Sequence, residues 1–82
     1  MITITFYDEE SVKKNFRDYE ADCLVEICGS EADVTNILDC TADAFPNSWG
    51  SGSKNNFKGY AMVSNFSHYL DFVILLNDYF NQ

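Results

Sequence analysis

Hydrophobic and polar residues alternate at the beginning of the chain, in the segment Ile-Thr-Ile-Thr-Phe-Tyr at residues 2–7. A period of two is typical of a β-strand that buries one face, so this segment predicts a half-buried strand. Residues 22–28, with the sequence Asp-Cys-Leu-Val-Glu-Ile-Cys, predict a second strand that ends at Gly29. Residues 57–64 predict a third strand, although Gly59 within it is a poor strand former.

Other segments have apolar residues at the helical spacing of three or four positions. The first helix is expected over residues 9–19, where Asp8 is the predicted N-cap and acidic residues precede basic ones, as the helix dipole favours. The second helix is expected over residues 31–45. It follows Ser30, a predicted N-cap, and it ends at Pro46.

The last helix is expected to begin after Ser67, as its N-cap, and to reach about Phe80; a strand over residues 71–76 is the alternative. Residues 46–56 are rich in Gly, Ser and Asn and predict an exposed loop. The order of elements is then β-α-β-α-β-α. We expect an α+β fold, a small mixed α/β architecture with a three-stranded sheet and about three packed helices, in one acidic globular domain over residues 1–82.

The composition favours a folded protein in a reducing compartment. Of the 82 residues, 46% are hydrophobic, including seven Phe and five Tyr, which suffices for a small core. The beginning of the chain has neither the basic nor the apolar region of a signal peptide, and no apolar run is long enough to cross a membrane. Three cysteines are too few for a secreted disulfide framework, and Cys23 and Cys28 fall on opposite faces of one predicted strand. We expect reduced thiols and a cytoplasmic location.

The acidic residues are concentrated in one part of the sequence. Residues 8–43 contain 11 acidic and only three basic residues, so this stretch accounts for the whole net charge of −8. Outside it, Asp71 and Asp78 are balanced in number by Lys54 and Lys58. A field of one sign attracts partners of the opposite charge.

Asp39 and Asp43 are the acidic residues that folding explains least. They lie one helical turn apart on the polar side of the second predicted helix, where like charges repel and the helix dipole disfavours anions. Acidic residues at helix starts, such as Glu9 and Glu31, are stabilised by the same dipole. We therefore interpret Asp39 and Asp43 as the centre of a partner-binding surface.

Two further features are candidates for that surface. Asp18, Glu20, Asp22 and Glu26 run from the end of the first predicted helix into the second strand, and they extend the surface if both groups lie on one side of the domain. An ordinary solvated turn and sheet face is the alternative for these four. Trp49, in the predicted loop, either folds back onto the core or is an exposed anchor for a partner.

The sequence offers no motif for catalysis or for a cofactor. Cys23, Cys28, Cys40 and His68 lack the close pairing of zinc ligands, so we expect buried free cysteines and no metal. The Gly-Ser-Gly-Ser-Lys segment at residues 50–54 lacks the spacing of a phosphate-binding loop. We expect neither enzymatic activity nor a cofactor.

The charge also restricts the kind of partner. A chain with a net charge of −8 repels nucleic acid, whose binders supply Lys and Arg to the phosphates. A protein with a basic groove is attracted instead, and carboxylates on a rigid helix can occupy the positions of phosphates. In size and charge the chain resembles phage or plasmid anti-defence proteins, such as anti-CRISPR and anti-restriction inhibitors, and immunity proteins for nuclease toxins. The resemblance assigns no functional residue.

The sequence thus leads to two hypotheses. The first is a small, non-enzymatic inhibitor that binds the basic, nucleic-acid-contacting surface of a nuclease or of a nucleic-acid-guided defence complex, as a nucleic-acid mimic. The alternative is an adaptor or regulatory subunit that binds a protein through the aromatic surfaces of its last helix and Trp49, with acidity serving only solubility. A homodimer is open under both. Binding that weakens as salt rises separates the first hypothesis from the second.

Overall fold

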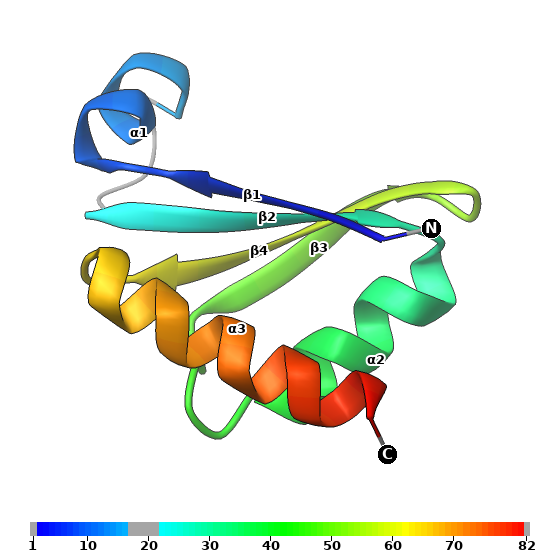
Figure 1. The fold of residues 1–82 in the computed structure, drawn as a ribbon. Coiled ribbons are helices and arrows are strands. Elements are labelled where there is room, and N and C mark those ends of the chain that lie inside the picture. Colours follow the sequence, from blue (N-terminus) through cyan, green and yellow to red (C-terminus); the bar gives the residue numbers. More distant parts are fainter. Residues whose placement is uncertain (1, 17–21, 82) are drawn as a thin grey trace.

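The computed structural model describes residues 2–16 and 22–81, which form three helices and one four-stranded sheet (Figure 1). In chain order the elements are β1 (Thr3–Tyr7), α1 (Glu9–Asn15), β2 (Cys23–Gly29), α2 (Glu31–Thr41), β3 (Ser48–Ser53), β4 (Asn56–Val63) and α3 (Phe66–Phe80). The prediction of a small α+β domain with three helices is confirmed. The sheet has four strands, so the predicted number of strands and the predicted order of elements were wrong.

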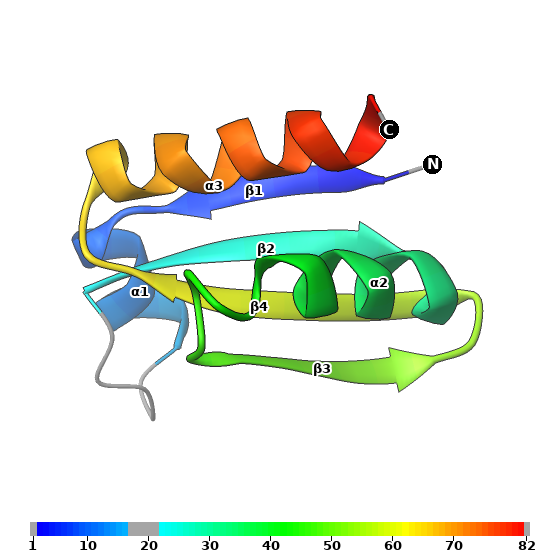
Figure 2. The same ribbon diagram turned by 90° about the horizontal axis from the view of Figure 1, so that it is seen from below.

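All neighbouring strands of the sheet are antiparallel, in the order β1-β2-β4-β3 (Figure 2). In the register, Phe6 lies opposite Val25, and Val25 lies opposite Ala61, so one face of the sheet carries apolar side chains across three strands. The helices α2 and α3 cover this face, which we call the helix-covered face (Figure 1). The short α1 lies at one end of the sheet on its other side, which we call the second face.

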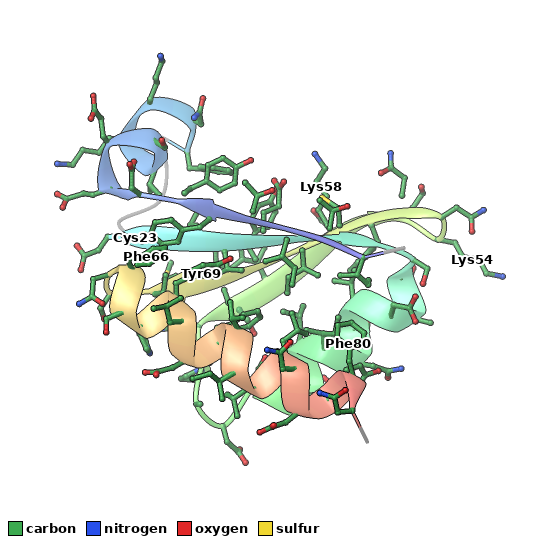
Figure 3. All side chains as sticks on the ribbon, in the orientation of Figure 1. Cys23, Lys54, Lys58, Phe66, Tyr69 and Phe80 are labelled. Carbon is green, nitrogen blue, oxygen red and sulfur yellow. The ribbon has the colours of Figure 1, made fainter. Side chains whose placement is uncertain are left out.

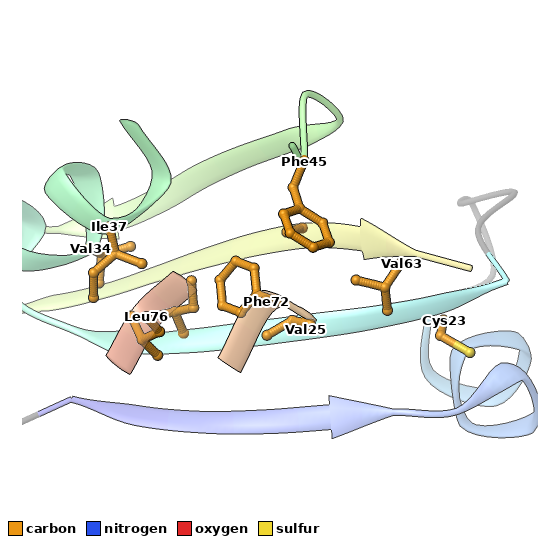
Figure 4. Packing of buried hydrophobic residues seen from close by; sticks show 10 residues of the cluster. Cys23, Val25, Val34, Ile37, Phe45, Val63, Phe72 and Leu76 are labelled. Carbon is orange, nitrogen blue, oxygen red and sulfur yellow. The ribbon is translucent and has the colours of Figure 1, made fainter. Parts of the chain in front are cut away.

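The core lies between the helix-covered face and these two helices (Figure 4). The strands contribute Cys23, Val25, Ile27, Ala61 and Val63, and the helices contribute Val34, Ile37, Phe72 and Leu76. Phe45, which follows α2, completes the core: its side chain is 2% exposed, and its ring meets that of Phe72 edge to face with 5.2 Å between the centroids. This packing fixes α2 and α3 and thereby positions their outer surfaces.

The Gly- and Ser-rich segment after α2 is not the exposed loop that the sequence predicts, because it contains β3 and the turn into β4. Ser53 pairs with Asn56, which leaves Lys54 and Asn55 as a two-residue turn. Tight hairpin turns usually carry Asn-Gly or a similar pair, and strands are usually rich in β-branched residues; neither this turn nor β3 has these signals. The turn is held by the backbone N–H of Glu31, which donates to the carbonyl oxygen of Lys54 at 3.0 Å.

Two of the three predicted N-caps are confirmed. The side chains of Asp8 and Ser30 accept hydrogen bonds from backbone N–H groups at 2.8 and 3.2 Å. The third helix begins earlier than predicted, because its N-cap is Asn65, and not Ser67; the Asn65 side chain accepts a backbone N–H at 2.9 Å. The alternative of a strand over residues 71–76 was therefore wrong.

Two helices end earlier than their sequence patterns predict. The first ends at Asn15 and not at residue 19, and residues 17–21 lie outside the described part of the chain. The second ends at Thr41 and not at residue 45. The Thr41 hydroxyl donates to the carbonyl oxygen of Ile37 at 2.9 Å, and residues 42–44 then form a turn that leads Phe45 into the core.

Candidate functional site

Asp39 and Asp43, the predicted centre of the partner-binding surface, both have exposed side chains. Asp39 lies on the outer side of α2, because Val34, Ile37 and Thr41 are the buried positions of this helix. Asp43 lies just beyond the helix, in the turn after Thr41, and not within the helix as the sequence predicts. Neither carboxylate takes part in core packing.

Two more carboxylates lie beside this end of α2. Asp22, just before β2, and Asp71, in α3, each line a shallow hollow, and the two hollows share Phe45 and His68. Since Phe45 follows Asp43 by two residues, the two acids flank the turn that carries Asp43. We call this group the acidic corner; its four members, all exposed, are Asp22, Asp39, Asp43 and Asp71.

Asp71 was not among the residues predicted for this surface, because its charge is balanced in number along the chain. There, Asp71 and Asp78 are balanced by Lys54 and Lys58, but the fold separates the two pairs. Lys58 lies in β4 opposite Cys28, on the second face of the sheet. Lys54 lies in the hairpin turn, beside the beginning of α2 and not its end. The fold therefore places neither lysine at the end of α2, beside Asp71.

The helices that form this surface contain no Lys or Arg. Together with the turn after α2 they expose six carboxylates, those of Glu31, Asp33, Asp39, Asp43, Asp71 and Asp78. We call this larger group the acidic layer. It includes Asp39, Asp43 and Asp71 of the acidic corner and extends their negative charge along both helices, with Lys54 near the beginning of α2.

Of the remaining residues predicted for this surface, the structure describes Glu26 and Trp49, and it places both away from the acidic corner. Asp18 and Glu20 lie outside the described residues. Glu26 is only 8% exposed and lies in β2 on the second face of the sheet, so it does not extend the acidic corner. Trp49 is half-buried in β3, on the same face as Glu26, and its ring stacks on Tyr60 with 5.5 Å between the centroids. The prediction that Trp49 lies in an exposed loop was wrong.

Glu26 is the centre of a hydrogen-bonded group on the second face. The Tyr60 hydroxyl donates to its Oε2 at 2.9 Å, while the Tyr7 hydroxyl and the Cys28 thiol donate to its Oε1 at 3.4 and 3.5 Å. These donors compensate a carboxylate that would be costly to bury alone. Burial, reinforced by the hydrogen bond to Glu26, raises the pKa of Tyr60. This group joins three strands, so folding explains it.

The floor of the acidic corner is aromatic. The His68 ring stacks on Phe45 with 4.6 Å between the centroids, and its Nδ1 accepts a hydrogen bond from the backbone N–H of Ser64 at 3.0 Å. Ile74 borders the same hollow as Asp71. Carboxylates beside an apolar hollow suit a Lys or Arg side chain, because its aliphatic stem packs on the apolar groups while its charged end pairs with a carboxylate.

All three cysteines are free thiols, and Cys23 and Cys28 lie on opposite faces of β2 as predicted. Cys23 is buried, but Cys28 is only half-buried and Cys40 is exposed, so the prediction of buried cysteines was wrong for these two. Within the described part of the chain, no three His, Cys, Asp or Glu side chains are placed to hold a metal ion. None of the described helices is long and apolar enough to span a membrane. Comparisons with protein-family models, curated proteins and solved structures gave no match. Function is therefore inferred from geometry and charge alone.

Proposed function

We propose that the protein is a small, non-enzymatic inhibitor that binds a basic protein surface through the acidic corner. The target surface is one that contacts nucleic acid, in a nuclease or in a nucleic-acid-guided defence complex. The observation that supports this most is the acidic layer, in which α2, its following turn and α3 expose six carboxylates and contain no Lys or Arg. Phosphates are repelled by such a surface, and the groups that bind phosphates are attracted to it.

The carboxylates of the acidic corner are carried by well-packed elements. Val34 and Ile37 are 0% and 1% exposed and anchor α2, while Phe45 anchors the turn that carries Asp43. Carboxylates held in fixed positions lose less conformational entropy on binding than those of a mobile acidic tail. This rigidity favours mimicry of a phosphate arrangement over a purely non-specific attraction. The free thiols agree with action in a reducing compartment such as the cytoplasm.

A second candidate function, an adaptor that binds through apolar contacts, is favoured by a different observation. Phe66, Leu70, Ile74 and Phe80 of α3 are between 44% and 58% exposed. Binding through such residues persists at high salt, because hydrophobic contacts are not screened by ions. Salt dependence therefore distinguishes the two candidates.

Capture of partners on the immobilised protein, from a lysate of its native host, tests the proposal. After elution with a NaCl gradient, we expect a nucleic-acid-binding protein that elutes at moderate salt and is displaced by DNA or RNA. An Asp39→Asn/Asp43→Asn bait should release it at lower salt than the wild type does. A Glu9→Gln/Glu10→Gln bait is the matched control, because it removes the same charge from α1, on the other side of the sheet. Equal retention by all three baits at every salt concentration would contradict the proposal.

A further inference from the structure

The outer edge of β1 and the helix beside it form a second exposed surface. β1 is the last strand on its side of the sheet, so one row of its backbone N–H and C=O groups has no partner among the described strands. Figure 2 shows that α3 runs along β1 and projects beyond it. The helix therefore forms a ledge under the position that a fifth strand would take.

This ledge is apolar and continuous with the edge strand. Phe66 and Phe80, near the two ends of α3, are 56% and 55% exposed, and Figure 3 shows them with Tyr69 spaced along the helix. The ring of Phe6 in β1 lies 5.3 Å from that of Phe66 and 4.8 Å from that of Tyr69, between centroids. A covering strand would remove this apolar surface from water, which is favourable in proportion to the area buried.

The edge of β1 lacks the features that usually prevent pairing. Thr3–Tyr7 contains no charged residue and no Pro, whereas edge strands that stay unpaired commonly carry Lys, Pro or a bulge. The opposite edge strand, β3, contains Gly50 and Gly52, which weaken a strand. Of the two edges, β1 is the better suited to accept a partner.

A second copy of the chain does not fit this edge by antiparallel pairing. Two β1 strands related by a two-fold axis would place both α3 helices on the same face of the joined sheet. Because each α3 projects beyond its own β1, the two helices would occupy the same space. An extended segment that carries no such helix avoids this conflict.

We propose that the β1 edge binds an extended segment of a partner protein as a fifth strand. Its alternate apolar side chains pack on Phe66 and Phe80, and its backbone pairs with β1. Basic residues in the segment are favoured by the net charge of −8. This site is distinct from the acidic corner and does not depend on the inhibitor function proposed above. It uses Phe66 and Phe80 of the apolar surface that favours the second candidate.

Titration of the ¹⁵N-labelled protein with the synthetic peptide Lys-Val-Thr-Val-Thr-Val-Lys tests this site by NMR. We expect shifts of the β1 amides and slower hydrogen exchange along the edge. A peptide with Pro in place of the central Val is the first control, since Pro lacks the N–H and cannot continue the ladder. Phe66→Ser should weaken peptide binding about tenfold, because it removes apolar area that the bound peptide would cover.

Ile74→Ser is the matched control on the protein. Ile74 is also in α3 and is 58% exposed, but it borders the hollow of the acidic corner and not the β1 edge, so its replacement should leave the shifts of the β1 amides unchanged. An absence of β1 shifts, or equal binding by the Phe66→Ser variant, would overturn the inference. Dimers in sedimentation that Phe66→Ser dissociates would also overturn it, in favour of a second copy. The salt-dependent binding through Asp39 and Asp43 is measured separately, so none of these results bears on it.

Discussion

The hydroxyl of Tyr60 in β4 donates a 2.9 Å hydrogen bond to Oε2 of Glu26 in β2, and the two residues are 34 positions apart in the sequence. This bond ties a carboxylate that is only 8% exposed to the second face of the sheet. An acidic residue that the sequence places among the surface charges thus belongs to the internal structure. It stabilises the sheet whose other face carries α2 and α3.

Replacement of Tyr60 by Phe tests this role of the hydrogen bond. Tyr60→Phe keeps the ring and leaves Glu26 with only its weaker donors, so we expect the free energy of unfolding to fall by about 1–3 kcal/mol. Urea denaturation followed by circular dichroism measures the change. Tyr69→Phe is the control, because the Tyr69 ring packs on Phe6 and Phe66, and it should alter the free energy by less than about 0.5 kcal/mol. Equal losses in both variants would contradict the role.

Because the pKa of Tyr60 is raised in the folded protein, we expect the stability of the fold to decrease at high pH. The folded protein holds the hydroxyl proton more tightly than the unfolded chain, where the pKa is near its ordinary value of 10.0. The stabilisation is therefore complete below about pH 10 and is lost as the pH rises above it. We expect the free energy of unfolding to decrease above about pH 10, and to decrease less steeply in Tyr60→Phe. Identical pH profiles would show that this hydroxyl is not involved.

Gly59 in β4 leaves no room for a side chain. A Cβ at this position would lie 2.6 Å from Cγ1 of Val34 and 3.1 Å from Cδ1 of Leu38, both in α2. Val34 is β-branched and fully buried, so it cannot easily move away. Gly59→Ala should therefore displace α2 and lower the free energy of unfolding by about 1–3 kcal/mol. A thermal or urea denaturation curve that matches the wild type would show that β4 and α2 can accommodate the added methyl group and would contradict this prediction.

The same glycine shows what the sequence could and could not predict about the fold. Gly59 is a poor strand former, yet the strand exists because the missing side chain allows α2 to lie close to the sheet. β1, α1 and α2 were predicted because alternation and N-caps are local signals. β3 was missed because its stability comes from pairing with β4 and from the stacking of Trp49 on Tyr60, which are not visible in the local sequence.

The acidic corner was predictable in part for a similar reason. Asp39 and Asp43 were predicted because like charges one helical turn apart repel, which a sequence displays, although the structure places Asp43 in the turn beyond the helix. Asp71 was missed, and Glu26 was taken as a candidate for the same surface, because only the fold shows which distant residue is a neighbour. Charge counted along a chain predicts net charge, but it does not predict the sign of one face.

The most direct measurement of the central proposal is the affinity for the captured, purified partner as a function of NaCl concentration. We expect log Kd to rise with log salt for the wild type. Asp39→Asn/Asp43→Asn should bind about two- to thirtyfold more weakly at low salt with a shallower slope, because exposed pairs contribute roughly 0.2–1 kcal/mol each. Glu9→Gln/Glu10→Gln should follow the wild-type curve more closely. Affinity that is independent of salt and equal in all three proteins would contradict binding through the acidic corner.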